Sequence, residues 1–297
     1  MTPSPRALAA PLRLPSDRGT SSPEGGRDWA RLQAHHEVER ELAQRLKSAD
    51  PAARKRLYSE AYDELYRRVP DHPQLVHKQD AADRRRYVAD QMRLLGRFLG
   101  ADARFIEIGP GDCALSLHVC PLVREVHAVD VSAEITRRSD LPPNFALHLS
   151  DGVSVPHPDG GVDVVYSNQL MEHLHPDDAR DQLRNIVAAL APGGVYVCVT
   201  PNRLMGPHDI SRYFSDEAQG LHLKEYTATE LLALFQLAGL RHTQVLVAIR
   251  NRYLRLPHWL VRAAETTMGH ASAAVRRRMA HWPPFRWLAT ICIVASA

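Results

Sequence analysis

The feature that most constrains this chain is the segment FIEIGPGDCA at residues 105–114. Its first four residues are apolar except for Glu107, and this pattern predicts a short buried strand. Gly109 and Gly111 follow, and a turn built on glycines has no Cβ atoms that would keep a ligand away from the backbone. Further apolar residues after position 114 suit a packed helix. A strand, a glycine turn and a helix start in this order predict a nucleotide-sized pocket at the carboxyl edge of a parallel sheet.

The remainder of the chain alternates between strand and helix patterns. A helix is expected at about 176–190, and a second begins at Thr227-Ala-Thr-Glu230, which has the form of a capping box, and ends at Gly239. Strands are predicted at 105–108, 125–131, 145–150, 162–167, 195–200, 244–249 and 289–296. This alternation indicates an α/β fold, namely a Rossmann-like, seven-stranded, mostly parallel sheet with helices on both faces and an N-terminal helical cap.

Composition changes along the chain predict five segments. Residues 1–27 are rich in proline and arginine and are expected to be a disordered tail, because their apolar run is too short for a secretory signal. Residues 28–100 have helical patterns and are expected to form the cap, and residues 101–249 form the cofactor-binding core. A basic insertion at 250–286 then precedes the final core strand at 287–297.

Overall composition narrows the class of protein. The hydrophobic fraction is 44% and the charged fraction is 24%, which is typical of a soluble globular protein. The net charge of +3 is too small to indicate nucleic-acid binding by itself, and no apolar run has the length of about 18 residues that a membrane span needs. The four cysteines form no C-x-x-C pair, so we expect reduced core thiols in a cytoplasmic protein.

Two classes of cofactor use a pocket of this kind, dinucleotides and S-adenosylmethionine. The glycine turn fits the dinucleotide pattern G-x-G-x-x-A, and Asp130 could accept hydrogen bonds from a ribose diol in either ligand. Glu107 separates the two, because a buried carboxylate repels a pyrophosphate and favours the ammonium and sulfonium groups of S-adenosylmethionine. Asp151, at the end of the next predicted strand, could accept a hydrogen bond from an adenine amino group.

Together with VDVVYSN at 162–168 and PGG at 192–194, these motifs resemble the class I S-adenosylmethionine-dependent methyltransferases. The resemblance covers about residues 104–248 and, more loosely, the final strand. One departure is Cys113, which stands where the family often has a third glycine. The resemblance implies S-adenosylmethionine as the cofactor, with contacts from Glu107, Gly109 and Gly111 at the methionine end, Asp130 at the ribose with Val131 beside it, Asp151 at the adenine with Gly152 beside it, and Asn168 beneath the methionine and sulfonium.

Simpler interpretations stay open for three of these positions. Asp130 could only end a strand, Asp151 with Gly152 could form a plain turn, and Asn168 could be a turn residue whose side chain contacts no ligand.

Methyl transfer from a sulfonium is an in-line displacement, so the protein mainly has to hold the acceptor atom in line with the methyl group. A hydroxyl acceptor also benefits from a general base, most naturally a histidine. Position selects three of the sixteen histidines as candidates, although each could instead be structural: His173, His208 and His222. His208, Asp209, His222 and Glu225 could bind a metal ion if their loops converged, but their spacing matches no zinc signature and no metal is predicted.

The basic insertion at 250–286 contains eight arginines and a single acid, Glu265, interleaved with tryptophans. It could be a packed cap over the substrate site, a contact for an anionic substrate, or a weak contact with an anionic membrane surface. The sequence therefore predicts an S-adenosylmethionine-dependent methyltransferase that acts on a hydroxyl of a small molecule or glycan. The alternatives are an RNA or protein methyltransferase that docks through 250–286, a non-catalytic binding module with the same fold, and a dinucleotide oxidoreductase.

Overall fold

A computed structural model describes residues 27–77, 81–133, 141–156, 161–249, 252–282 and 285–297. The predicted disordered tail at 1–27 lies almost entirely outside these residues. The N-terminal helices are α1 (Trp29–Ser48), α2 (Pro51–Arg68), α3 (Pro73–His77) and α4 (Ala81–Leu95). The helices that follow are α5 (Ala114–Val119), α7 (Pro176–Ala189), α8 (Ala228–Ala238), α9 (His258–Gly269) and α10 (Ala273–Met279). Short 3₁₀ turns lie at η3 (Cys120–Leu122), η4 (Met171–His173), η5 (Arg203–Met205), η6 (Ile210–Tyr213) and η7 (Phe285–Leu288).

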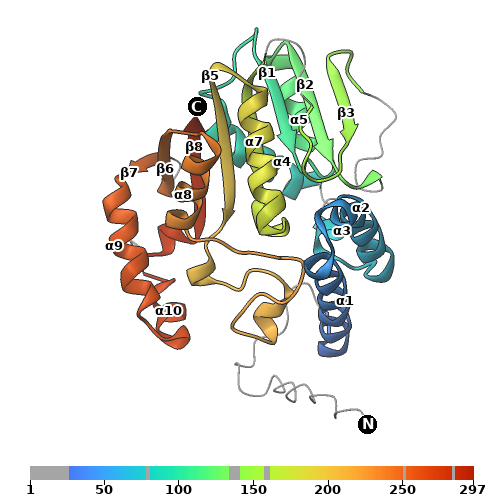
Figure 1. The fold of residues 1–297 in the computed structure, drawn as a ribbon, viewed down its shortest axis with the longest axis vertical. Helices are drawn as coiled ribbons and strands as arrows, with labels where there is room; N and C mark the ends of the chain where they lie inside the picture. Colours follow the sequence, from blue (N-terminus) through green and yellow to red (C-terminus); the bar gives the residue numbers. More distant parts are fainter. Residues whose placement is uncertain (1–26, 78–80, 134–140, 157–160, 250–251, 283–284) are drawn as a thin grey trace.

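One sheet of eight strands forms the centre of the molecule (Figure 1). In sequence order the strands are β1 (Arg104–Ile108), β2 (Glu125–Asp130), β3 (Phe145–Leu149), β4 (Val162–Asn168), β5 (Leu190–Pro201), β6 (His242–Ile249), β7 (Arg252–Leu256) and β8 (Thr290–Ser296). Their spatial order is β3-β2-β1-β4-β5-β8-β6-β7, in which β1 to β5 pair in parallel and β8 pairs antiparallel with both of its neighbours. The predicted Rossmann-like α/β fold with a mostly parallel sheet is confirmed.

The strand count corrects the prediction of seven strands. The additional strand is β7, which lies inside the predicted basic insertion and pairs antiparallel with β6 at the edge of the sheet. Its sequence RYLRL was interpreted as part of a charged segment, and charged side chains are a common feature of edge strands because they discourage pairing with another chain.

Side chains at alternate strand positions pack into two separate hydrophobic cores, one on each face of the sheet. Ile106 belongs to the core that α2, α7 and α8 cover, whereas its neighbour Phe105 belongs to the core that α4 and α5 cover. The capping box at Thr227 and the left-handed Gly239 bound α8 as the sequence predicts. All four cysteines are buried and unbridged.

Helices α1, α2 and α3 lie at one side of the sheet, and α9 and α10 lie at the other (Figure 1). Asp28 and Asp50 cap α1 and α2, because each side chain accepts a hydrogen bond from a backbone N–H in the first turn. A buried ion pair then fastens α2 to α7: Asp178 accepts hydrogen bonds from Arg54 Nε at 2.7 Å, Arg54 Nη2 at 3.0 Å and the Tyr58 hydroxyl at 2.7 Å. This attachment holds α2 beside the carboxyl ends of the central strands.

Candidate active site

A cavity of about 640 Å³ lies at the carboxyl ends of β1, β2 and β4. This is the switch point of the sheet, because the chain proceeds outward from β1 to β3 and then returns with β4 on the other side of β1. Its volume falls in the range of about 300–1,000 Å³ that is usual for small-molecule sites. Residues of the sheet edge form one wall, and residues of α2, α3 and α4 form the other.

The glycine turn presents bare backbone to this cavity. Gly109 and Gly111 both line it and have positive φ angles of +73° and +56°, a conformation that side chains with a Cβ rarely adopt. A Cβ on Gly109 would also come within 3.3 Å of Leu170 Cδ1. The N–H of Gly109 donates to the carbonyl of Val129 on β2, so the turn is tied to the neighbouring strand.

Asp130 ends β2 and lines the cavity beside the glycine turn, with Val131 next to it in the lining. One carboxylate oxygen accepts the N–H of Gly111 at 3.3 Å, and the other accepts the N–H of Ser132 at 3.0 Å. These bonds fix the acid to the turn. An ionised carboxylate at this place is the group that can accept hydrogen bonds from a ribose diol.

Glu107 lies in β1 with 2% of its surface exposed, and it is not among the residues that line the cavity. Its carboxyl group accepts a hydrogen bond from the hydroxyl of Ser116 on α5. Burial raises the pKa of Glu107 to about 8, although the hydrogen bonds from Ser116 oppose this shift. The acid therefore sits behind the glycine turn, and the direct contact with a cofactor that the sequence suggested stays a prediction.

Replacing Glu107 by glutamine should make the stability of the protein less dependent on pH. Because the pKa of about 8 in the folded protein exceeds that of an exposed glutamate, the stabilising contribution is complete below pH 4 and is lost as the pH rises towards 8. Urea unfolding at about pH 5 and about pH 8.5 should show Glu107→Gln gaining stability relative to the wild type at the higher pH. If the wild type and the variant differed in unfolding free energy by the same amount at both pH values, the raised pKa of Glu107 would be contradicted.

Asp151 and Gly152 differ in their relation to the cavity. The carboxylate of Asp151 accepts the N–H groups of Val153 at 2.9 Å and Ser154 at 2.7 Å, and Asp151 is not a lining residue. Gly152 does line the cavity, and the ring of Tyr58 lies 2.8 Å from the position that a Cβ would occupy. The geometry therefore favours the interpretation of Asp151 as the residue that forms the turn, and its contact with adenine stays a prediction.

Asn168, the last residue of β4, lines the cavity opposite α4. Its amide nitrogen donates to the hydroxyl of Tyr87 on α4 at 3.3 Å. Gln169 follows with a positive φ of +54° and also lines the cavity. The end of β4 thus connects the sheet edge to the helical wall.

The helical wall contains residues that sequence reasoning missed. Tyr58, Tyr62 and Tyr66 all line the cavity, because a spacing of four residues places them on one face of α2. The sequence does contain a sign of this wall, namely three tyrosines spaced four residues apart in the otherwise charged segment that forms α2. The ring of Tyr62 lies 6.3 Å from that of Tyr66 and 5.9 Å from that of His173, so this end of the cavity has an aromatic wall.

The three candidate histidines occupy different environments. His173 lines the cavity and its Nδ1 bonds the carbonyl of Leu221 at 3.1 Å, while burial lowers its pKa to about 3. His222 packs behind it, with the ring centroids 4.7 Å apart, and does not line the cavity. His208 also lies outside the lining, and its Nε2 bonds the carbonyl of Asn202 at 3.0 Å.

The possible metal site in the 201–226 region is not formed as a group. Its four polar residues form hydrogen bonds within the region instead: His208, Asp209, His222 and Glu225. Glu225 accepts both the backbone N–H of His208 and a ring nitrogen of His222, each at 2.7 Å. Asp209 accepts the N–H groups of Ser211 and Gly220. Within the described ranges, these four do not gather as a group of close metal ligands.

The described residues of the basic insertion do not form a wall of this cavity. None of its described residues lines this cavity, and α9 and α10 lie at the opposite side of the sheet from α1, α2 and α3 (Figure 1). Tyr253 and Arg286 line an adjoining cavity that also contains Asn168 and Gln169.

The one acid of the insertion, Glu265, is buried and accepts hydrogen bonds from the N–H groups of Ala228 and Thr229, so it caps the start of α8. The contacts of the insertion with an anionic substrate or a membrane surface stay predictions.

Across the part of the chain that is described, no helix combines the length and the apolar character of a membrane span.

A family profile described as a methyltransferase domain matches residues 81–245, which is more than half of the chain. The chain belongs to this methyltransferase domain family. The matched region begins with α4 and includes the glycine turn and the strand ends that form the cavity. The family membership that the sequence motifs suggested is confirmed.

Relatives of this methyltransferase domain occur among mycobacterial proteins. A probable S-adenosylmethionine-dependent methyltransferase of Mycolicibacterium smegmatis is 29% identical over 156 residues, which cover 52% of this chain and 58% of that protein. An uncharacterized methyltransferase of Mycobacterium tuberculosis is 30% identical over 99 residues, covering 32% of this chain and 49% of the relative. The chain thus spans about half the length of the curated relatives it matches.

Solved structures share the fold of this methyltransferase domain. A phosphoethanolamine N-methyltransferase of Haemonchus contortus aligns with a TM-score of 0.55 at 15% identity, covering 83% of this chain and 50% of that one. A Haloferax volcanii methyltransferase solved with an activator protein aligns with a TM-score of 0.51 at 19% identity, covering 74% and 94%. At these identities the likeness concerns the fold alone.

Proposed function

We propose that this protein binds S-adenosylmethionine at the glycine turn and transfers its methyl group to a hydroxyl of a small molecule or glycan. The single observation that carries the proposal is the meeting of Gly109, Gly111, Asp130 and Asn168 in one cavity at the switch point of the sheet. The family membership and the printed description of the Mycolicibacterium relative support the same cofactor. S-adenosylmethionine would supply the activated methyl group.

The cofactor would occupy the half of the cavity formed by the strand ends. Gly109 and Gly111 would face the methionine end, Asp130 with Val131 would bind the ribose, and Gly152 would lie at the adenine side. Glu107, from behind the turn, and Asp151, through the turn it forms, would support these contacts indirectly.

The acceptor would occupy the aromatic half of the cavity. Tyr62, Tyr66 and His173 form a wall suited to stacking on the ring of a sugar or phenol. Helices α2 and α3 cover this half, which favours a small acceptor over an RNA or a folded protein. A histidine with a pKa of about 3 is a weak base at neutral pH, so positioning would carry most of the catalysis.

Transfer of a tritiated methyl group from S-adenosylmethionine to a panel of sugars, phenols, RNA and protein would test this proposal. We expect the label to appear in a small acceptor.

Tyr62→Ala should raise the KM for that acceptor about tenfold or more, because a stacking ring is lost, while the affinity for the cofactor stays the same. Leu254→Ala, at an exposed position of β7 that does not line the cavity, is the matched control and should change neither quantity. Label found only in RNA or protein, or cofactor binding without transfer to any acceptor, would contradict the proposal.

A further inference from the structure

Three side chains with metal-binding atoms converge at the wall of the cavity. Glu172 and His173 come from η4, and His222 comes from the segment before α8. One ligand atom of each lies within 4.8 Å of those of the other two. Glu172 is completely buried, His222 is 9% exposed, and His173 lines the cavity.

When both rings are neutral, the hydrogen bonds of the two histidines place a lone pair on Nε2 of each. Burial lowers the pKa of His222, but the hydrogen bond to Glu225 and the charge of Glu172 outweigh it and raise that pKa, so a metal ion that binds His222 displaces a proton. Nδ1 of His173 lies 3.1 Å from the carbonyl oxygen of Leu221, and Nδ1 of His222 lies 2.7 Å from a carboxylate oxygen of Glu225. Both partners accept hydrogen bonds, so Nδ1 is the nitrogen that carries the proton. Histidines that bind metal ions almost always donate their other ring N–H to a carbonyl or a carboxylate in this way.

Glu172 supplies an acceptor that lacks a partner within the described part of the chain. Its Oε2 accepts the hydroxyl of Thr200 at 2.7 Å, whereas its Oε1 is buried without any hydrogen bond. A buried carboxylate oxygen in this condition is costly, and a bound cation removes the cost. The orphaned oxygen is an observation independent of the histidine geometry.

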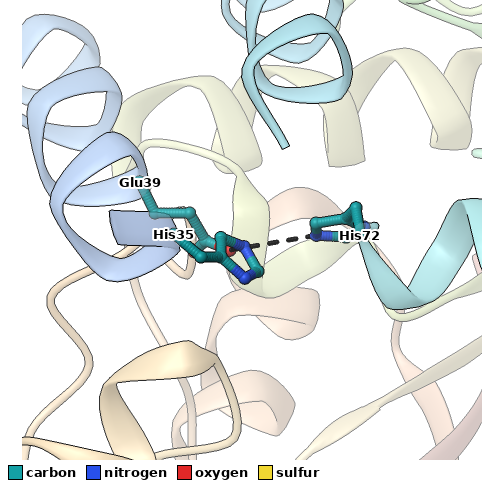
Figure 2. Close-up of side chains that lie close together, drawn as sticks. All are labelled: His35, Glu39 and His72. Atoms are coloured by element: carbon teal, nitrogen blue, oxygen red, sulfur yellow. Dashed lines mark hydrogen bonds and ion pairs between the residues drawn. The ribbon is translucent and has the colours of Figure 1, made fainter. Parts of the chain in front are cut away.

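A second cluster in the same protein is formed by His35, Glu39 and His72 (Figure 2). Its hydrogen bonds indicate the opposite proton arrangement. Nδ1 of His72 accepts the backbone N–H of Gln74 at 3.2 Å, and Nδ1 of His35 lies 3.1 Å from a nitrogen of Arg27, which can only donate. The Nε2 atoms of these two neutral rings therefore carry the protons.

In the second cluster the Nε2–H groups of His35 and His72 point towards the carboxylate of Glu39. Nε2 of His35 lies 2.7 Å from a carboxylate oxygen of Glu39, and Nε2 of His72 lies 3.9 Å from the same oxygen. The other oxygen of Glu39 accepts the N–H of Leu221. Glu39 is thus satisfied by hydrogen bonds within α1 and from the 201–226 region, with His72 at a longer ion-pair distance. In this arrangement the two histidines offer no lone pair to a metal ion.

We propose that Glu172, His173 and His222 bind one divalent transition-metal ion, for which Zn²⁺ is the best match. Two imidazole nitrogens and a carboxylate oxygen are typical zinc ligands, and three protein ligands leave one position for a water or an acceptor oxygen. Tetrahedral zinc separates its ligand atoms by roughly 3.4 Å, so small side-chain rotations bring the three groups to bonding distance. Because His173 lines the cavity, the ion would lie at the acceptor end of it.

The test is a titration of the full-length protein, stripped of metal with a chelator, with Co²⁺ alone. We expect one equivalent to bind with the visible absorption of a four-coordinate ion, and Zn²⁺ to displace it. Glu172→Gln should weaken Co²⁺ binding about 100-fold or more, and Glu225→Leu, which removes the acceptor of the His222 N–H, should weaken it about 10- to 100-fold. His35→Gln and His72→Gln, in the hydrogen-bonded cluster, are the matched controls and should bind Co²⁺ like the wild type.

Thermal melting without metal identifies variants that fold. A folded Glu172→Gln protein with unchanged Co²⁺ affinity would overturn the proposal, as would loss of binding in the His35 or His72 variants. Absence of saturable binding to the wild type overturns it without any variant. Binding is measured without S-adenosylmethionine or acceptor, so its failure is distinguishable from failure of the proposed methyl transfer.

Discussion

Asp178→Ala should lower the free energy of unfolding by about 3–5 kcal/mol. Asp178 and Arg54 are 2% and 3% exposed, and the aspartate accepts two hydrogen bonds from the guanidinium and one from the Tyr58 hydroxyl. Removing the carboxylate leaves a buried positive charge without its main partner. The same change frees α2 from α7, so the aromatic wall of the cavity should lose its position as well. Urea denaturation followed by circular dichroism measures the loss.

The neighbouring acid provides the matched control. The Asp177 side chain is 51% exposed and lies 4.0 Å from Arg54, so its contact is weakened by solvent. Asp177→Ala should cost less than about 1 kcal/mol. If the two alanine variants lost similar amounts of stability, the buried pair would not be what fastens α2 to the sheet domain.

Asp130→Ala should weaken the binding of S-adenosylmethionine about 10- to 150-fold, which corresponds to about 1.5–3 kcal/mol. The carboxylate lies at the end of β2 in the cavity lining, where it would accept hydrogen bonds from two ribose hydroxyls. An alanine leaves these hydroxyls without a charged acceptor. Calorimetric titration of both proteins measures the difference.

Asp151→Ala is the comparison that decides between the two acids. Its carboxylate is engaged by the N–H groups of its own turn and does not line the cavity, so we expect a change in affinity of less than about threefold. Should Asp151→Ala weaken binding as strongly as Asp130→Ala, the adenine contact implied by the family resemblance would be correct and the turn interpretation wrong.

The parts of the site that could be predicted are those encoded within a few residues. The glycines, Asp130 and Asn168 follow directly after predicted strands, and the carboxyl ends of parallel strands meet at one edge of a sheet. Strand positions were predictable for the same reason, since apolar runs bounded by turn residues mark them. The edge strand β7 was missed because its arginines obscured its pattern.

The parts that could not be predicted depend on how distant segments pack. Tyr62 and Tyr66 line the cavity because α2 packs over the sheet edge, through core residues such as Leu65 and through the pair of Arg54 and Asp178, which are 124 positions apart. The burial of Glu107 against Ser116, which raises its pKa, also depends on the packing of α5. Sequence position selected His173, His208 and His222 as candidate bases, and of these His173 lines the cavity, while the role of each stays a prediction. The sequence carried no information on which ring nitrogen bears the proton.

The central claim is that the cavity at the switch point binds S-adenosylmethionine. The most direct test is calorimetric titration of the full-length protein with S-adenosylmethionine and, separately, with NAD. We expect one equivalent of S-adenosylmethionine to bind with a dissociation constant on the order of micromolar, and NAD to bind at least about 100-fold more weakly, because the family membership and the description of the Mycolicibacterium relative support S-adenosylmethionine as the cofactor. Preferential binding of NAD, or no binding of S-adenosylmethionine by the folded protein, would contradict the account.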